Sequence, residues 1–258
     1  MSGRKIFTAS RLIRLSLLLL SVTAVTSCGG GFEPFVGVTS GKNKSYAAPV
    51  EALEYNYENV HGGSINGGCI PNTPGVDDYE VGKKRFGGGS TCGAAYLPAK
   101  WKPGMTAKIY WNVLPYPGWH AKVLNVPGLE FDQNEKNAIA QYDEDHSAVI
   151  PLPPPPPSAG DDFGKVRNIT VHFLACNQLY ITYGTVEEGR NTPMHYKLFA
   201  KSQKLCTPRP SIKSMADYRR NKAKMDAIKQ ERANIKQVIL PEYIKELEQQ
   251  GKLPTPSK

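Results

Sequence analysis

Short apolar segments, separated by Gly, Pro and Asn, recur along the middle of the chain. None is longer than seven residues, and most are rich in β-branched and aromatic residues: 92–97, 107–113, 121–126, 168–174 and 179–183. A further segment, 50–60, has an alternating pattern with Tyr55 and Tyr57 on one side. Runs of this length and composition predict strands. Together they predict a mainly β fold, an antiparallel β-sandwich-like domain over residues 47–208.

The composition changes near residue 209, where a basic segment with helical periodicity begins. Ser214 followed by Asp217 is a helix start signal, and Pro241 is expected to end or kink the helix. A narrow apolar stripe, interrupted by Arg232, lies between them: Tyr218, Met225, Ile228, Ile235 and Ile239. We therefore predict a C-terminal α-helical extension over residues 209–258. An apolar stripe of this kind is expected to pack against another surface. The alternatives are the chain's own β domain, a second copy through self-association, or a membrane surface.

Two segments of the predicted β domain look like loops. Residues 61–68 contain His61, Ser64 and Asn66 among four glycines, a composition that tolerates positive φ. Residues 143–162 combine acidic residues with the run Pro153 to Pro157, which cannot form a central strand. We expect this second segment to be a long exposed loop, either a partner-binding arm or a dispensable insertion.

The N-terminus has the pattern of an export signal. Four basic residues precede an apolar run centred on 15–20, which is too short to span a bilayer. The run ends in Val25-Thr26-Ser27-Cys28, which resembles the lipobox of bacterial lipoproteins. This resemblance implies a signal peptide over 1–27, lipidation of Cys28, and an outer-membrane lipoprotein that faces the periplasm. An ordinary signal peptide is the alternative. Residues 28–46 are expected to be a flexible tether.

Charge is distributed unevenly. The whole chain has a net charge of +9, of which residues 209–258 contribute +6, from twelve basic and six acidic residues. The four basic residues of the signal account for a further +4, so residues 28–208 carry about −1. A nucleic-acid groove would need Arg and Lys clustered with aromatic residues on the folded domain, so we expect no nucleic-acid partner.

Four cysteines remain if Cys28 is lipidated. An even number in an exported chain indicates disulfides, although four cysteines allow three pairings. We favour Cys69 with Cys92 and Cys176 with Cys206, because each pair closes a short local loop. A structural zinc site is the alternative, but close C-x-x-C pairs are missing.

The glycine triplet at 87–89 raises the question of catalysis. Lysines precede it rather than follow it, so it does not fit a phosphate-binding loop. Neither Ser64 nor Ser90 has the G-x-S-x-G spacing of a hydrolase elbow, and the five histidines show no metal-ligand spacing. We therefore expect no catalytic residue, metal or cofactor, and assign the triplet to a sharp turn that leads into a strand.

One longer pattern resembles a known family. The order FGGG, LPAKWKPGM, KIYW, WHAKVLNVPG and ITVHFL is similar to an uncharacterised family of Gram-negative lipoproteins encoded near lipase effectors of type VI secretion systems. The resemblance covers about residues 50–185. It implies an immunity lipoprotein that binds and inhibits a lipase or phospholipase toxin. An accessory envelope lipoprotein that assists secretion or effector loading is the alternative.

The immunity interpretation predicts loops that cover the lipase cleft. The candidate partner-binding residues lie in the two predicted loops: His61, Ser64, Asn66, Asp143, Glu144 and Asp145.

Overall fold

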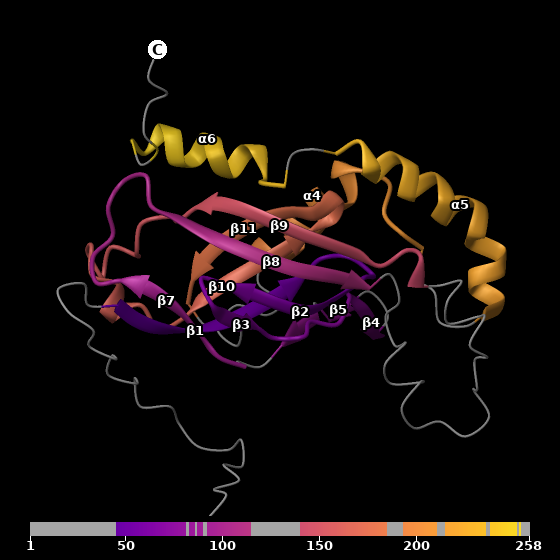
Figure 1. Ribbon diagram of the computed structural model, residues 1–258. Helices are drawn as coiled ribbons and strands as arrows, with labels where there is room; N and C mark the ends of the chain where they lie inside the picture. The colour runs from indigo at the N-terminus through magenta and orange to yellow at the C-terminus, as the bar shows by residue number, and fades with distance from the viewer. Residues whose placement is uncertain are drawn as a thin grey trace, which may run out of the picture. The chain divides into compact units, whose positions relative to one another are not determined.

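A computed structural model describes residues 45–80, 83–85, 87–89, 92–114, 140–184, 193–210, 215–235, 238–251 and 253. The signal peptide, Cys28, most of the tether and the strand predicted at 121–126 lie outside the described residues. The described residues contain two main β-sheets followed by three α-helices, so the predicted mainly β fold with a helical C-terminal region is confirmed (Figure 1).

The first sheet is organised around the long strand β1 (Ser45–Glu54). Its order is β11 (Gln178–Tyr183), β10 (Ile169–Leu174), β1 and β6 (Gly87–Gly89), and β7 (Ala94–Pro98) pairs with the first half of β1. The β1–β10 pair is parallel, while the other pairs are antiparallel. All six residues of β10 are buried, including the polar residues Thr170 and His172, as expected of a strand covered on both faces.

The second sheet is antiparallel throughout. Its order is β3 (Gly68–Ile70), β2 (Asn59–Ile65), β8 (Thr106–Leu114) and β9 (Glu144–Pro151). Along β8, buried residues alternate with exposed or half-buried ones, so one face of this sheet is covered and the other faces solvent. A separate pair joins β4 (Asp77–Glu80) to β5 (Lys83–Arg85).

Side chains from both sheets form a single hydrophobic core. Trp111 of β8 is 1% exposed, and its ring lies 5.9 Å, centroid to centroid, from that of Phe173 in β10. Ile109 of β8 and Val171 of β10 are fully buried in the same cluster. The sheets therefore pack face to face, as in a sandwich.

The helices are shorter and more numerous than predicted. They are α4 (Pro193–Leu205), α5 (Met215–Ala233) and α6 (Pro241–Gln249), with short 3₁₀ turns at Phe163–Lys165 and Ala175–Asn177. Helix α4 lies inside the region predicted to be only β-rich. The predicted C-terminal helix is in fact two helices, because α5 ends at Ala233 and Pro241 opens α6, where a missing N–H costs nothing.

Part of the apolar stripe of the tail is buried within the chain itself. Met225 and Ile228 of α5 are 0% and 1% exposed, and the Tyr142 hydroxyl donates to Asp226 at 2.5 Å. After α5 the chain becomes extended, and Ile239 forms a parallel bridge with Leu179 in β11. This burial agrees with a tail that packs on its own chain, while self-association and contact with a membrane surface stay predictions.

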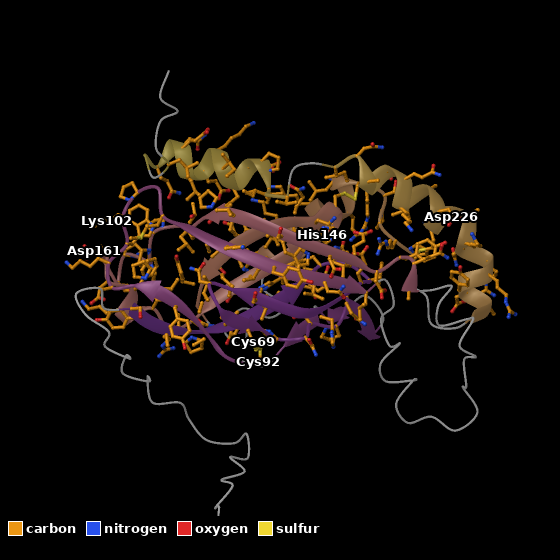
Figure 2. All side chains as sticks on the ribbon, viewed as in Figure 1. Cys69, Cys92, Lys102, His146, Asp161 and Asp226 are labelled. Carbon is orange, nitrogen blue, oxygen red and sulfur yellow. A yellow bond between two sulfur atoms is a disulfide. The ribbon has the colours of Figure 1, made fainter. Side chains whose placement is uncertain are left out.

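Four charged side chains form a buried cluster between the tail and the second sheet. Arg232 of α5 donates to Glu58 at 3.0 Å, and Arg209 forms ion pairs with Glu58 and with Glu144 of β9. His146 contacts Glu144 at 2.9 Å and lies near the centre of Figure 2. Burial raises the pKa of Glu58, but the charges of Arg232 and Arg209 outweigh this effect and hold that pKa below its usual range.

Both disulfides have the favoured pairing. Cys69 pairs with Cys92, with Cα atoms 5.8 Å apart, and Figure 2 shows this pair at the edge of the second sheet. Cys176 pairs with Cys206, with Cα atoms 6.0 Å apart, and joins the β10–β11 turn to the end of α4. The two bonds indicate an oxidising compartment outside the cytoplasm.

Three local predictions are wrong. Residues 50–60 are not one strand, because β1 ends at Glu54 and β2 begins at Asn59. The glycine triplet is itself strand β6, and glycine is needed there because a Cβ on Gly87 would lie 1.3 Å from the carbonyl oxygen of Pro74. Residues 61–68 are mostly the β2–β3 hairpin, and positive φ occurs at Gly62, Asn66 and Gly67.

The predicted loop over 143–162 also needs correction. Residues Glu144–Pro151 form β9, an integral strand of the second sheet. The proline run is partly docked, because Trp101 donates to the carbonyl of Leu152 at 3.0 Å and Tyr183 donates to that of Pro153 at 2.8 Å. An acidic strand is possible here because Asp145 faces solvent while Glu144 meets a buried arginine.

Candidate functional site

The solvent-facing side of the second sheet is the strongest candidate site. We define the outer face as the side chains that strands β2, β8 and β9 direct away from the core: His61, Ser64, Lys108, Tyr110, Asn112, Asp145, Ser147 and Val149. Strand pairing fixes their neighbours, because Ser64 and Ser147 lie on either side of Tyr110. In Figure 1, β8 and β9 run side by side across the front of the domain.

The outer face is hollowed beside Tyr110. The hollow has a volume of about 700 Å³ and is lined by Ser64, Asn66, Gly67, Lys108, Tyr110 and Ser147. Tyr110 is 41% exposed, so a large part of its ring is available to a ligand. An open hollow lined by an aromatic ring and hydroxyl groups suits a partner's side chain better than an enclosed small molecule.

Asp145 is held in a fixed position on this face. Its Oδ1 atom accepts hydrogen bonds from Asn112 Nδ2 at 3.0 Å and from the Tyr110 hydroxyl at 2.9 Å. These bonds lower the pKa of Asp145 below its usual range, so the side chain is ionised at neutral pH. Both bonds use Oδ1, and the Asp145 side chain is exposed, so an oriented negative charge is presented to solvent.

Lys108 supplies a positive charge on the same face. Two hydrogen bonds to Asn66 fix the Lys108 backbone. The Lys108 backbone N–H donates to Asn66 Oδ1 at 2.9 Å, and the Asn66 backbone N–H donates to the Lys108 carbonyl oxygen at 3.0 Å. Among the described residues, no carboxylate forms an ion pair with the Lys108 ammonium group. The strand is therefore rigid at this point, while the charge at the end of the side chain is available.

The composition of this surface is typical of protein-binding surfaces. Tyr96 of β7 is 55% exposed and borders the hairpin turn, because its carbonyl accepts from Asn66 Nδ2 at 3.5 Å. Val149 is 60% exposed. The surface thus combines rigid aromatic rings, from Tyr96 and Tyr110, with the adaptable hydroxyl groups of Ser64 and Ser147. Antibody paratopes use the same combination of Tyr, Ser, Asn and Gly.

The structure brings together four of the six predicted partner-binding residues. His61 and Ser64 come from β2, Asn66 from the hairpin turn and Asp145 from β9. Asn112 of β8 lies between His61 of β2 and Asp145 of β9. Strand β8 therefore separates the two predicted loops, 61–68 and 143–162, by only one strand. The Asn66 amide is used within the fold, and its role on this surface is to position Lys108.

The other two predicted residues lie elsewhere. The Glu144 side chain is 17% exposed and belongs to the buried charge cluster. Asp143 is exposed but precedes β9 and is not part of the outer face. Neither residue is brought to the hollow.

Sequence reasoning missed Lys108, Tyr110 and Ser147. The alternation in 107–113 contained the signal, because Ala107, Ile109, Trp111 and Val113 are buried and the intervening residues are not. Ser147 could not be found in this way, since its strand was read as a loop.

A second polar cluster lies in the core. Tyr55 OH lies 2.8 Å from His172 Nδ1, and His172 Nε2 lies 2.7 Å from Thr182 Oγ1. Burial lowers the pKa of His172 to about 3, so its ring is neutral at physiological pH. The His172 side chain is 1% exposed and therefore stabilises the packing of β1 against β10 and β11 rather than meeting a ligand.

Within residues 45–114 and 140–251, leaving out the gaps stated above, no three His, Cys, Asp or Glu side chains are placed to hold a metal ion. The same described part of the chain contains no helix long and apolar enough to cross a membrane.

Comparison with known proteins finds one family model that matches part of the chain. Residues 55–181 match the model of a family described as protein of unknown function (DUF3304). The matched range contains the whole outer face. No curated protein and no solved structure matches the chain.

Proposed function

We propose that this chain, of which residues 55–181 match the DUF3304 family model, is a lipid-anchored periplasmic immunity protein. It binds and inhibits a lipase or phospholipase effector of a type VI secretion system. The observation that carries the proposal is the outer face, a rigid strand surface with exposed tyrosines, hydroxyl groups and an oriented carboxylate. The two disulfides support a location outside the cytoplasm, and the sequence resemblance supports the class of partner.

Inhibition follows from occlusion. A lipase must admit a lipid chain to its cleft, and a protein bound over the cleft or its lid prevents this. A sheet face is suited to the task, because β2, β8 and β9 hold the contact residues without a folding cost at binding. A lipid anchor adds to the effect by concentrating the inhibitor at the membrane that the toxin attacks.

The first experiment is reconstitution. Residues 29–258 are mixed with the lipase encoded beside this gene, and complex formation and phospholipase activity on liposomes are measured at equimolar concentrations. We expect a stable complex without lipase activity. No complex, together with full lipase activity, would refute the immunity function and favour the accessory envelope role.

A matched pair of variants connects inhibition with the outer face. Tyr110→Ala removes the exposed ring at the centre of the face, whereas Tyr196→Ala removes a tyrosine of similar exposure, 39% against 41%, from α4. We expect the first variant to weaken inhibition and the second to leave it unchanged. Equal inhibition by both variants would show that the lipase binds another surface.

The lipid anchor has its own test. A Cys28→Ser variant, expressed with a radiolabelled fatty acid, should incorporate no label and should leave the membrane fraction. Continued incorporation would contradict the lipoprotein assignment without affecting the binding experiment.

A further inference from the structure

The outer face carries two opposite charges on strand positions whose backbone separation is fixed. Asp145 of β9 lies opposite Asn112, and Lys108 lies four residues earlier than Asn112 along β8. Four residues of strand span about 13 Å. This distance exceeds the Debye length of about 8 Å at physiological ionic strength, so the two charges barely neutralise each other.

Between the charges lies the hollow beside Tyr110. Its walls are Tyr110, Ser64 and Ser147, with Lys108 at one end. Asp145 lies beyond the other end, and its carboxylate is oriented by hydrogen bonds from the Tyr110 hydroxyl and the Asn112 amide. The surface is therefore ordered as cation, aromatic hollow and anion along the direction of the strands.

We propose that the outer face recognises a protein surface with the reverse order of charges. The partner presents an acidic side chain to Lys108 and a basic side chain to Asp145, about 13 Å apart, with an uncharged side chain in the hollow. The inference rests on the proposed immunity function and specifies which lipase surface is bound. Charge complementarity argues for a different protein rather than a second copy of this chain. A second copy could match the two charges only if its outer face were turned end for end. In that arrangement two Tyr110 rings would compete for one hollow.

The two charges contribute in different ways. Asp145 is already oriented by its two hydrogen bonds, so binding a cation costs little side-chain entropy. Lys108 is fixed only at its backbone, by Asn66, and its flexible side chain adapts to the position of the acid. Charges of this kind control partner choice and association rate more than total affinity.

The test measures affinity and association rate for residues 29–258 and the lipase encoded beside the gene. Lys108→Glu and Asp145→Lys should each weaken binding by about tenfold or more. The double variant retains the net charge of the wild type but reverses the order of charges, so its expected loss cannot come from a change in net charge. Asp145→Asn separates the charge from the hydrogen bonds, because an amide oxygen still accepts from Asn112 and Tyr110.

Lys102→Glu is the matched control. It replaces a lysine by a glutamate, as Lys108→Glu does, but in the turn after β7. Figure 2 shows Lys102 beside Asp161 and away from His146, which belongs to β9. Its affinity should stay within about twofold of the wild type, and the thermal midpoints of all the variants should be unchanged because both target side chains are exposed.

A direct readout complements the affinities. A carbodiimide couples an ammonium group to a carboxylate that contacts it, so mass spectrometry of the treated complex should show Lys108 joined to an acidic residue of the lipase. Reversal variants that bind like the wild type while the complex still inhibits the lipase would overturn the charge inference and leave the immunity function intact. If the wild-type protein forms no complex with the lipase, the immunity function fails and this inference fails with it.

Discussion

Replacing Arg232 by Met should destabilise the protein strongly, although the residue is not part of the outer face. The Arg232 and Glu58 side chains are 3% and 4% exposed, and the guanidinium group donates to the carboxylate at 3.0 Å. Without Arg232, Arg209 has to compensate both Glu58 and Glu144, so the buried cluster holds one negative charge in excess, which costs about 3–5 kcal/mol. In a domain of this size, that corresponds to a fall of about 6–20 °C in the thermal midpoint.

The assay is urea unfolding followed by fluorescence, with the free energy of unfolding extrapolated to water. The double variant Glu58→Gln/Arg232→Met removes both charges and leaves Arg209 paired with Glu144, so it should recover more than half of the loss. Arg220→Met is the control, because Arg220 is 72% exposed and pairs with Asp217 at the surface. Exposed pairs contribute about 0–1 kcal/mol.

Two outcomes would refute the reasoning. If Arg232→Met costs no more than Arg220→Met, water reaches the cluster and its charges are solvated. If the double variant is no more stable than the single one, the loss comes from packing of the arginine stem rather than from an uncompensated carboxylate.

Three further predictions concern other parts of the fold. Gly87→Ala should cost about 1–3 kcal/mol or more, because the new Cβ would lie 1.3 Å from a backbone oxygen of Pro74; an unchanged thermal midpoint would contradict the close approach. Replacing both Cys176 and Cys206 by Ser should cost about 2–4 kcal/mol in urea unfolding, and chemical reduction should then have no further effect at this site. Burial lowers the pKa of His172 to about 3 in the folded chain, against about 6.5 when unfolded. The unfolded state therefore binds the extra proton between these values, and stability falls as the pH is lowered through that range. A His172→Asn variant should lose less free energy of unfolding over the same range, and equal pH slopes would disprove the assignment.

Strands with strict alternation were predictable from the sequence. In 107–113, the pattern indicates both the strand and the side that each residue faces, because packing against the core requires a period of two. The hairpin at 61–68 had a signal that was overlooked, since Asn66-Gly67 is the dipeptide that favours tight hairpin turns. The glycines nearby obscured it.

Other features depend on contacts between distant residues. Helix α4 buries His195, Leu198 and Ser202, a face with only one aliphatic member, so its hydrophobic periodicity is weak. Strand β9 looked like an acidic loop because nothing near Glu144 in the sequence indicates that Arg209 will neutralise it. Arg232 interrupts the apolar stripe of the tail for the same reason, since its partner lies 174 residues away.

That separation has a consequence for the order in which the chain folds. Glu58 lies in the link between β1 and β2 and is synthesised early, whereas Arg209 and Arg232 come near the end of the chain. Until both arginines arrive, the site that will enclose Glu58 and Glu144 contains two carboxylates and no cation, so closing it is unfavourable. Because the C-terminal part of the chain is synthesised last, the domain can close around this site only when synthesis is nearly complete.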